Sequence, residues 1–175
     1  MSNLKKIIFR LQKLHPKEID LSLNRIKTIC NKLQNPEKNL KVISVVGTNG
    51  KNSTIQAMRS ILSEANIKTN IYTSPHIQKI NERFVYNNIE ISDQELSKLL
   101  IEVEEINKGE EITYFEILTA VFLKKANEYK NNLNIIEAGL FHRFDATNIF
   151  DKNLASIVTA IGLDHTDWLP KNERT

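Results

Sequence analysis

One segment of the chain constrains the fold more than any other. Residues 42–46 form a short apolar run rich in β-branched side chains, which is typical of a strand buried on both faces of a sheet. The run ends in a turn that contains Gly47 and Gly50, and Lys51 and Ser53 follow at the mouth of an amphipathic helix. A strand, a glycine-bearing turn and a helix in this order predict a parallel α/β unit.

The chemistry of this turn is that of a phosphate-binding loop. Glycines let backbone N–H groups point inward, a helix N-terminus adds about half a positive charge, and Lys51 adds a full one. The usual G-x-x-x-x-G-K-[ST] pattern is met only in part, because Val45 and Asn52 replace its first glycine and its hydroxyl residue. We expect ATP as the ligand, and a helix start without a ligand is the alternative. The expected ATP contacts are Gly47, Thr48, Asn49, Gly50, Lys51, Asn52 and Ser53.

The rest of the chain repeats the alternation of strands and helices. Residues 68–72, 133–136 and 156–161 are predicted strands, each apolar enough to lie in the centre of a sheet. Residues 4–14 and 21–33 have apolar side chains at helical spacing and form a helical lead-in. This pattern predicts a mostly parallel sheet whose site lies at the carboxyl ends of the strands.

Local signals predict where helices begin and where the chain turns. The helix after the glycine turn is expected over residues 53–65, and residues 87–88 are expected to form the two-residue turn of a hairpin. Two capping boxes of the form S/T-x-x-E are present, at Ser92 with Glu95 and at Thr113 with Glu116.

Composition limits the class of protein. A chain of 175 residues with 41% apolar residues can form one domain with a core, and it is too short for two large ones. Its 24 basic and 21 acidic residues are nearly balanced, so charge does not favour a nucleic-acid partner. Cys30 is the only cysteine, which excludes an internal disulfide and a cysteine-based zinc site. Without a membrane span or a signal-peptide core, we expect a cytoplasmic protein with no membrane partner.

Polar residues follow the predicted strands, at positions that share one edge of a parallel sheet. Ser74, Glu137 and His165 bring a hydroxyl, a carboxylate and an imidazole to that edge. With water and phosphate oxygens, such ligands can hold Mg²⁺. Each residue also has a simpler interpretation: Ser74 in a turn before Pro75, Glu137 as a solvated carboxylate, and His165 as a helix cap or a surface histidine.

A series of short motifs occurs in a fixed order between about residue 20 and residue 170. They are Gly47-Thr48-Asn49-Gly50-Lys51, Tyr72-Thr73-Ser74-Pro75-His76, Asn81-Glu82-Arg83, Ile91-Ser92-Asp93, Thr113-Tyr114-Phe115-Glu116, Asp145-Ala146-Thr147-Asn148 and Ile161-Gly162-Leu163-Asp164-His165. In this order they resemble the motifs of folylpolyglutamate synthase and dihydrofolate synthase, a family of the Mur ligase superfamily. The expected fold is therefore the central ATPase domain of those ligases, a P-loop-type sheet flanked by helices.

The resemblance implies an ATP-dependent amide ligase of folate and one-carbon metabolism. Such an enzyme adds L-glutamate to a folate or dihydropteroate carboxylate through an acyl phosphate, with ATP and Mg²⁺. By the same resemblance, Lys51, Glu137 and His165 are the catalytic residues, acting by position and charge, and Ser74, Glu137 and His165 hold the metal. The expected substrate contacts are Pro75, His76, Arg83, Arg143 and Asp145. We expect small-molecule partners and a monomer.

The domain boundaries follow from the same comparison. Residues 1–40 are expected to form the helical lead-in and residues 41–175 a P-loop ATPase domain, incomplete at its C-terminus and without a C-terminal ligase domain. We therefore expect the chain alone to be inactive. The family has glycine where Asn52 stands, and two glycines where Phe141 and His142 stand. Two alternatives remain, a Mur-type ligase acting on a cell-wall precursor and a non-catalytic, truncated nucleotide-binding fragment.

Overall fold

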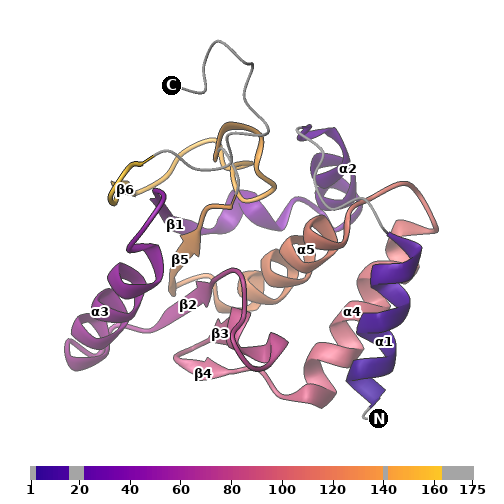
Figure 1. Cartoon of the computed structure of the whole chain (residues 1–175), viewed down its shortest axis with the longest axis horizontal. Helices are drawn as coiled ribbons and strands as arrows, with labels where there is room; N and C mark the ends of the chain where they lie inside the picture. The colour runs from indigo at the N-terminus through magenta and orange to yellow at the C-terminus, as the bar shows by residue number, and fades with distance from the viewer. Residues whose placement is uncertain (1–2, 16–21, 140–141, 163–175) are drawn as a thin grey trace.

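A six-stranded sheet organises the computed structural model, which describes residues 3–15, 22–139 and 142–162 (Figure 1). The strand order is β4-β3-β2-β5-β1-β6. Strands β2, β5, β1 and β6 run parallel, and β3 and β4 are antiparallel additions at one side. The predicted mostly parallel α/β sheet is confirmed. The strands are β1 (Lys41–Val46), β2 (Thr69–Tyr72), β3 (Phe84–Tyr86), β4 (Ile89–Glu90), β5 (Leu133–Glu137) and β6 (Ala155–Val158).

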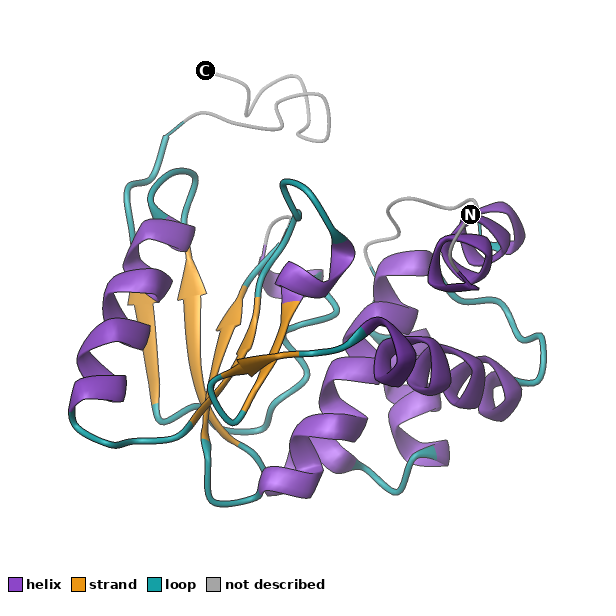
Figure 2. Cartoon of the chain, turned by 90° about the horizontal axis from the view of Figure 1, so that it is seen from below, coloured by secondary structure: helices purple, strands orange, loops and turns teal. Residues whose placement is uncertain are grey.

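Helices cover both faces of the sheet, but unequally. Figure 2 shows one helix, α3, on one face and the bundle of α1, α2, α4 and α5 on the other. The helical lead-in predicted from residues 4–14 and 21–33 belongs to that bundle, where α1 packs on α4 and α2 packs on α5. The helices are α1 (Asn3–Leu14), α2 (Asn24–Lys32), α3 (Lys51–Glu64), α4 (Asp93–Asn107) and α5 (Tyr114–Ala126), with short 3₁₀ turns at Pro36–Asn39, Ile80–Arg83, Asn127–Tyr129 and His142–Phe144.

The sheet separates two hydrophobic clusters. Successive residues of a strand point to opposite faces, so Tyr72 and Ile136 join the large cluster under the helix bundle, and Ile71 and Ile135 join a small one under α3. Ile55 is the fully buried residue that α3 contributes to the small cluster. Most of the apolar burial therefore lies on the bundle side.

The predicted turn at residues 87–88 is confirmed. Asn87 and Asn88 have φ angles of +53° and +69°, and they join the antiparallel strands β3 and β4. The side chain of Asn70 ties this hairpin to the sheet, because its oxygen accepts from Asn87 N at 3.0 Å and its amide donates to Asn134 Oδ1 at 2.9 Å. The end of the sheet opposite the candidate site is thus held by buried amides.

The two predicted capping boxes differ in the structure. At Thr113 the box is complete, since its hydroxyl accepts from Glu116 N and Glu116 accepts from Thr113 N at 2.7 Å. Ser92 accepts from Glu95 N at 3.2 Å, but the Glu95 carboxylate pairs with Lys125 Nζ at 2.6 Å instead of returning to Ser92 N. The prediction of a second complete box was wrong, because a tertiary ion pair takes its carboxylate.

Two further predictions need correction. β6 is an edge strand with mostly exposed side chains, and Val158 is 60% exposed, whereas the sequence predicted a strand in the centre of the sheet. β-Branched composition marks a strand, but it does not reveal whether a neighbour lies on its far side. α3 begins at Lys51 rather than near Ser53, because Gly50 with φ +84° stands directly before it. None of the helices in the described ranges has the length and apolarity of a transmembrane span.

Candidate functional site

The loop between β1 and α3 depends on its glycines. Gly47 has a φ of +140°, and a Cβ placed on it would lie 2.1 Å from Thr159 Oγ1. Gly50 has a φ of +84°, in the left-handed region that favours glycine. The loop therefore turns tightly against the segment after β6 before it enters the helix.

The first turn of α3 suits an anion. The first N–H groups of a helix have no acceptor within the helix, and no side chain among the described residues caps α3. The first turn also carries no acidic residue. The side chain of Asn52 is exposed and accepts from Gln56 Nε2 at 3.2 Å, along the outside of the helix. The arrangement fits a phosphate group, and Asn52 in place of glycine does not fill the cradle.

Lys51 faces back over the loop. Its ammonium donates to Gly47 O at 2.7 Å and to Thr48 O at 3.3 Å, and it lies 4.0 Å from Glu137 Oε1. The side chain is about one-fifth exposed. A full positive charge is thus held at the carboxyl edge of the sheet, beside a carboxylate from the neighbouring strand.

Glu137 ends β5 and joins two of the predicted segments. Its Oε2 accepts from Ser74 N at 3.0 Å, and its Oε1 lies closest to Lys51. Burial raises the pKa of the Glu137 carboxyl. The hydrogen bond from Ser74 N–H and the charges of Lys51 and Arg83 lower it, but the effect of burial is larger. The structure therefore brings Lys51, Ser74 and Glu137 together, as the strand-end argument predicted, while His165 lies outside the described residues.

The metal site itself stays a prediction. Among the described residues, no three His, Cys, Asp or Glu side chains gather closely enough to hold a metal ion. Glu137 accepts from Ser74 N, and its pKa is raised by burial. Such a carboxylate is a fitting ligand for a hard cation, because the cation offsets the cost of burying the charge. The chemistry of the donors fits Mg²⁺.

The predicted substrate residues lie in two loops at the same edge. Pro75 and His76 are exposed, and Arg83 Nε donates to His76 Nδ1 at 3.0 Å. Partial desolvation and the charge of Arg83 lower the pKa of His76, in keeping with a neutral ring that accepts a hydrogen bond. Arg83 thus orients His76 within the loop after β2.

Arg143 and Asp145, the other two predicted substrate contacts, make separate local contacts. The Arg143 guanidinium lies 5.3 Å from the ring centroid of Phe144. Asp145 is buried and accepts from both the backbone and the hydroxyl of Thr147. Desolvation raises the pKa of Asp145, and hydrogen bonds from the Thr147 hydroxyl and from the N–H groups of Thr147 and Gly139 lower it. Asp145 therefore fixes the local loop, and Arg143 is left exposed.

The sequence is similar to those of known synthases. The chain is 40% identical over 159 residues to a dihydrofolate synthase/folylpolyglutamate synthase of Haemophilus influenzae and 41% identical over 154 residues to one of Bacillus subtilis. The chain is homologous to the N-terminal portion of the dihydrofolate synthase/folylpolyglutamate synthase family. The alignments cover 91% and 84% of this chain, and 36% of each relative. The chain thus spans about a third of the length of these relatives.

Solved structures agree with this assignment. E. coli FolC in complex with DHPP and ADP matches with a TM-score of 0.89 and 36% identity, over 99% of this chain and 42% of that one. A bifunctional folylpolyglutamate synthase/dihydrofolate synthase from Yersinia pestis, complexed with AMPPNP and a Mn ion, matches with a TM-score of 0.86 and 36% identity, over 97% and 41% of the two chains. No family model matches the chain.

The sequence did not predict the contacts that two carboxylates, Glu82 and Glu116, make in the structure. Glu82 accepts from three successive backbone N–H groups, those of Ile77, Gln78 and Lys79. Its place beside Arg83 in a family motif was the available signal, but the sequence does not show which backbone groups it meets. Glu116 was interpreted only as a cap.

The Glu116 carboxylate also binds a buried arginine. It accepts from Arg25 Nε at 3.0 Å and from Arg25 Nη2 at 3.2 Å, and both side chains are largely buried. This two-pronged contact joins α2 to the start of α5. It therefore ties the helical lead-in to the helix bundle.

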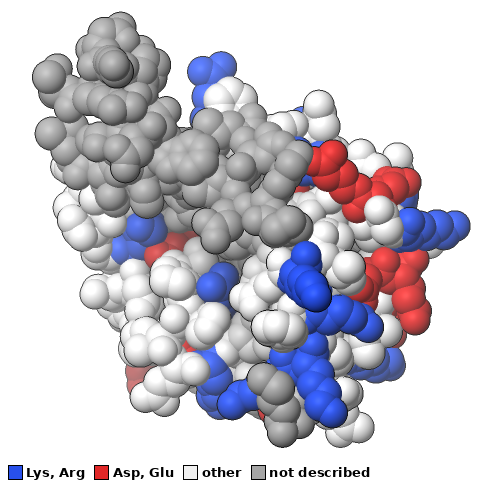
Figure 3. All heavy atoms as spheres, turned by 45° about the vertical axis from the view of Figure 1, so that its right-hand side comes forward, with Lys and Arg blue, Asp and Glu red and all other residues white. Residues whose placement is uncertain are grey.

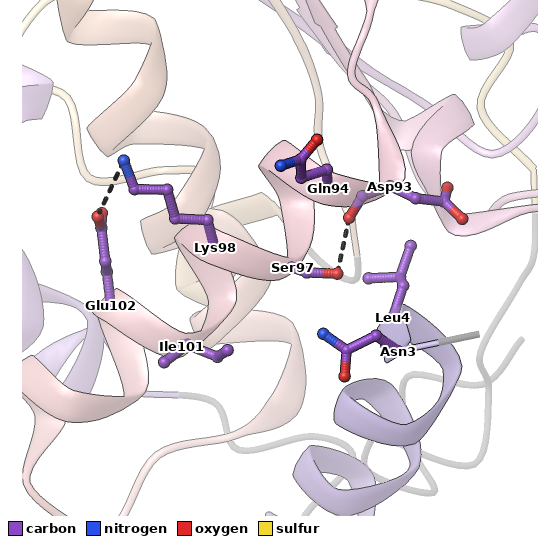
Figure 4. A pocket seen from close by; sticks show the side chains of 8 residues that line it. All are labelled: Asn3, Leu4, Asp93, Gln94, Ser97, Lys98, Ile101 and Glu102. Carbon is purple, nitrogen blue, oxygen red and sulfur yellow. Dashed lines mark hydrogen bonds and ion pairs between the residues drawn. The ribbon is translucent and has the colours of Figure 1, made fainter. Parts of the chain in front are cut away.

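A hollow lies away from the strand ends, between α1 and α4 (Figure 4). It has a volume of about 540 Å³, and Leu4 and Ile101 are among its lining residues. Two polar contacts lie within its lining, since Ser97 Oγ donates to Asp93 O at 2.7 Å and Lys98 pairs with Glu102. Charged side chains of both signs appear on the face shown in Figure 3. Neither feature adds chemistry to the site.

Proposed function

We propose that this chain supplies the nucleotide and metal side of an ATP-dependent amide ligase that adds L-glutamate to a folate or dihydropteroate carboxylate. The observation that carries the proposal is the meeting of Lys51, Ser74 and Glu137 at the carboxyl edge of the sheet. The relatives support it, because the E. coli neighbour holds DHPP and ADP and another bifunctional synthase holds Mn, AMPPNP and L-glutamate.

The proposed roles follow from charge and position. The N–H groups at the mouth of α3 and the Lys51 ammonium would bind the phosphates, and Lys51 would offset the charge that builds on the transferring phosphoryl group. Ser74, Glu137 and the predicted His165 would hold Mg²⁺, which adds further positive charge at the phosphates. His76, Arg83, Arg143 and Asp145, with Pro75, would contact or shape the folate side.

The reaction gains from activation of a poor electrophile. A carboxylate oxygen of the substrate attacks the γ-phosphorus of ATP, ADP leaves, and an acyl phosphate forms. The glutamate amine then attacks the acyl carbon, phosphate leaves, and the amine proton is lost. We place this reaction in the cytoplasm, with small-molecule partners and a monomeric chain. In this proposal, residues 1–40 are the helical lead-in and residues 41–175 are part of the ATPase domain.

The test is nucleotide binding by the Lys51→Ala variant. We expect its affinity for ATP with Mg²⁺, measured by titration calorimetry, to fall at least about ten-fold, because a charge-assisted phosphate contact is lost. Lys41→Ala is the matched control, since Lys41 is an exposed lysine at the opposite end of β1. Both variants should remain folded, which thermal unfolding checks. If Lys51→Ala binds ATP as tightly as the parent, the phosphate-loop assignment is wrong.

A further inference from the structure

Asn49 and Gly50 are the exposed part of the loop between β1 and α3, which we call the nucleotide loop. Thr48, just before them, is anchored, because its N–H donates to Ala160 O at 2.8 Å and its hydroxyl donates to Gly162 O at 3.1 Å. Within the described ranges, the side chain of Asn49 has no hydrogen-bond partner. Its amide is therefore in water and can change rotamer beside Gly50.

Asn49 is the only asparagine of the chain that a glycine follows. An asparagine amide is chemically labile where the next backbone nitrogen can reach its side-chain carbonyl carbon. Glycine has no Cβ to hinder this approach, and Gly50 has a φ of +84°. Its N–H donates to no acceptor among the residues that the structure describes. The attacking nitrogen and the carbon that it would attack are thus adjacent and unprotected.

The asparagines elsewhere in the chain are better protected. Asn70 and Asn134 are buried, and one donates to the other at 2.9 Å. Asn52 is exposed, but it lies within α3, where the helix fixes its backbone. Asn66 is exposed in the turn after α3 with a φ of +57°, but an isoleucine follows it. Asn52 and Asn66 are therefore internal controls for Asn49.

We propose that Asn49 is a site of spontaneous deamidation that weakens nucleotide binding, with the backbone nitrogen of Gly50 as nucleophile and water as the only co-reactant. The nitrogen gives its proton to water and bonds to the side-chain carbonyl carbon of Asn49. The bond from that carbon to the side-chain nitrogen breaks, and the nitrogen takes up a proton and leaves as ammonia. Water then opens the cyclic imide at either carbonyl, which gives aspartate or isoaspartate.

The surroundings favour the first step. The N-terminus of α3 and the Lys51 ammonium, which donates to Gly47 O and Thr48 O, place positive charge at this loop. Positive charge stabilises the deprotonated nitrogen of Gly50. The site that suits an anion therefore also promotes the reaction that destroys its neutral amide.

The product changes the charge of the nucleotide loop. Aspartate and isoaspartate both carry a carboxylate where Asn49 had a neutral amide, and isoaspartate also lengthens the backbone by one atom. The effect on binding rests on the proposed function, in which the phosphates meet Lys51 and the N–H groups at the mouth of α3. A negative charge in this loop repels the phosphates, so the modified chain should bind ATP more weakly.

The modification is measured on the chain without nucleotide. The chain is incubated at mildly alkaline pH, which favours loss of the amide proton, and tryptic peptides are analysed by mass spectrometry before and after. Asn49, Asn52 and Asn66 fall on three successive peptides, which cover residues 42–51, 52–59 and 60–68. We expect modification at Asn49 to be at least about ten-fold faster than at either control, because only Asn49 precedes a glycine. Equal rates at the three positions would overturn the inference.

Gly50→Ala tests the nucleophile. A Cβ at this position would lie 3.9 Å from Thr159 Cβ, an ordinary contact, so the variant is strained but does not clash. We expect its rate at Asn49 to fall about ten-fold, because the methyl group hinders ring closure. An unchanged rate, or aspartate without isoaspartate in the parent, would overturn the inference, since direct hydrolysis needs neither Gly50 nor the imide. The comparison of the three parent peptides stands even if this variant does not fold.

The effect on binding is measured separately, by titration calorimetry with AMPPNP and Mg²⁺. Asn49→Asp and Asn49→Ser both remove the amide and differ in charge, so we expect the aspartate variant to bind at least about five-fold more weakly than the serine variant. Equal affinities would overturn the predicted loss of nucleotide binding. If the parent chain does not bind AMPPNP, the proposed function is overturned, while the peptide rates still decide whether Asn49 is modified.

Discussion

Among the five glycines of the chain, Gly47 is the one at which an added Cβ would come closest to another atom. Alanine there would combine a φ of +140° with a Cβ 2.1 Å from Thr159 Oγ1. We expect Gly47→Ala to lower the free energy of unfolding by roughly 2–4 kcal/mol, because both backbone strain and a steric clash are added. Chemical denaturation of the ligand-free chain measures the change.

The control separates the two causes. Gly109 has a φ of +74°, and an added Cβ would meet no atom within 4 Å, so Gly109→Ala introduces strain without a clash. It should cost only about 1–2 kcal/mol. Equal losses in the two variants would contradict the close approach of the nucleotide loop to the segment after β6.

The buried carboxylate of Glu137 lowers the stability of the folded chain at neutral pH. Burial raises the pKa of its carboxyl in the folded state above the unfolded value. Between these two pKa values the folded state binds more protons, so stability falls as the pH rises through that window. We expect Glu137→Gln to raise Tm by a few degrees at pH 7 without added metal, and the difference to vanish below about pH 4, where both states are protonated.

Thermal unfolding followed by circular dichroism at the two pH values checks this. Glu105→Gln, at an exposed carboxylate on α4, should shift Tm little at either pH. A Glu137→Gln chain that is less stable than the parent at pH 7 would mean that Lys51 and the Ser74 N–H outweigh the desolvation of the carboxylate.

The convergence of these residues was predictable from the sequence, but their local contacts were not. Lys51 and Ser74 follow parallel strands and Glu137 ends one, so topology alone brings them to one edge. The hydroxyl contact of Thr48 depends on where the backbone of Gly162 lies. No periodicity or spacing encodes that position, because it is set by loop conformation.

Among the elements, the loop after β2 is organised by one carboxylate. Glu82 accepts from Ile77 N at 2.8 Å, from Gln78 N at 3.0 Å and from Lys79 N at 2.9 Å. These N–H groups lower the pKa of Glu82, so it is ionised at neutral pH. The carboxylate thereby takes the place of the acceptors that a strand or helix would supply to this loop.

Removal of that carboxylate should free the loop without unfolding the chain. We expect Glu82→Ala to speed amide exchange at residues 77–79 on the order of ten-fold, and to change Tm by less than about 2 °C because the loop lies at the surface. Hydrogen exchange read by mass spectrometry measures both the loop and the core. Glu64→Ala, at the exposed end of α3, is the control, and slow exchange of residues 77–79 in Glu82→Ala would refute the role of Glu82.

Periodicity predicted correctly which segments form strands and which form helices. The predictions that were wrong depended on tertiary contacts. The hairpin at Asn87 and the complete box at Thr113 are local, and both were predicted. The half-formed box at Ser92 failed because Lys125, distant in sequence, attracts Glu95. β6 was predicted in the centre of the sheet but lies at its edge, because side-chain type does not show whether a strand has a neighbour on both sides.

At the scale of the whole molecule, the chain spans 36% of its H. influenzae relative, and its candidate site lies at the carboxyl edge of the sheet. Ile77 and Ile161, in the loops at that edge, are 84% and 80% exposed. An acyl phosphate formed there would be open to hydrolysis, and the reaction needs its reactants held together away from water.

We therefore expect the 175 residues, expressed by themselves, to bind nucleotide and to form no glutamylated product. Incubation with ATP, Mg²⁺, labelled glutamate and dihydropteroate or tetrahydrofolate, followed by chromatography, measures this. The full-length H. influenzae relative serves as the positive control. Product released over many turnovers would show that these residues contain a complete catalytic site.

The unequal clusters on the two faces of the sheet have a further consequence. α3 rests on a small apolar patch with Ile55 as its one fully buried residue, while the opposite face holds most of the core. Such a thinly anchored helix opens more readily than the bundle, in partial unfolding events that leave the rest intact. Because the nucleotide loop leads directly into α3, we expect a bound nucleotide to protect this helix from local unfolding and from proteolysis.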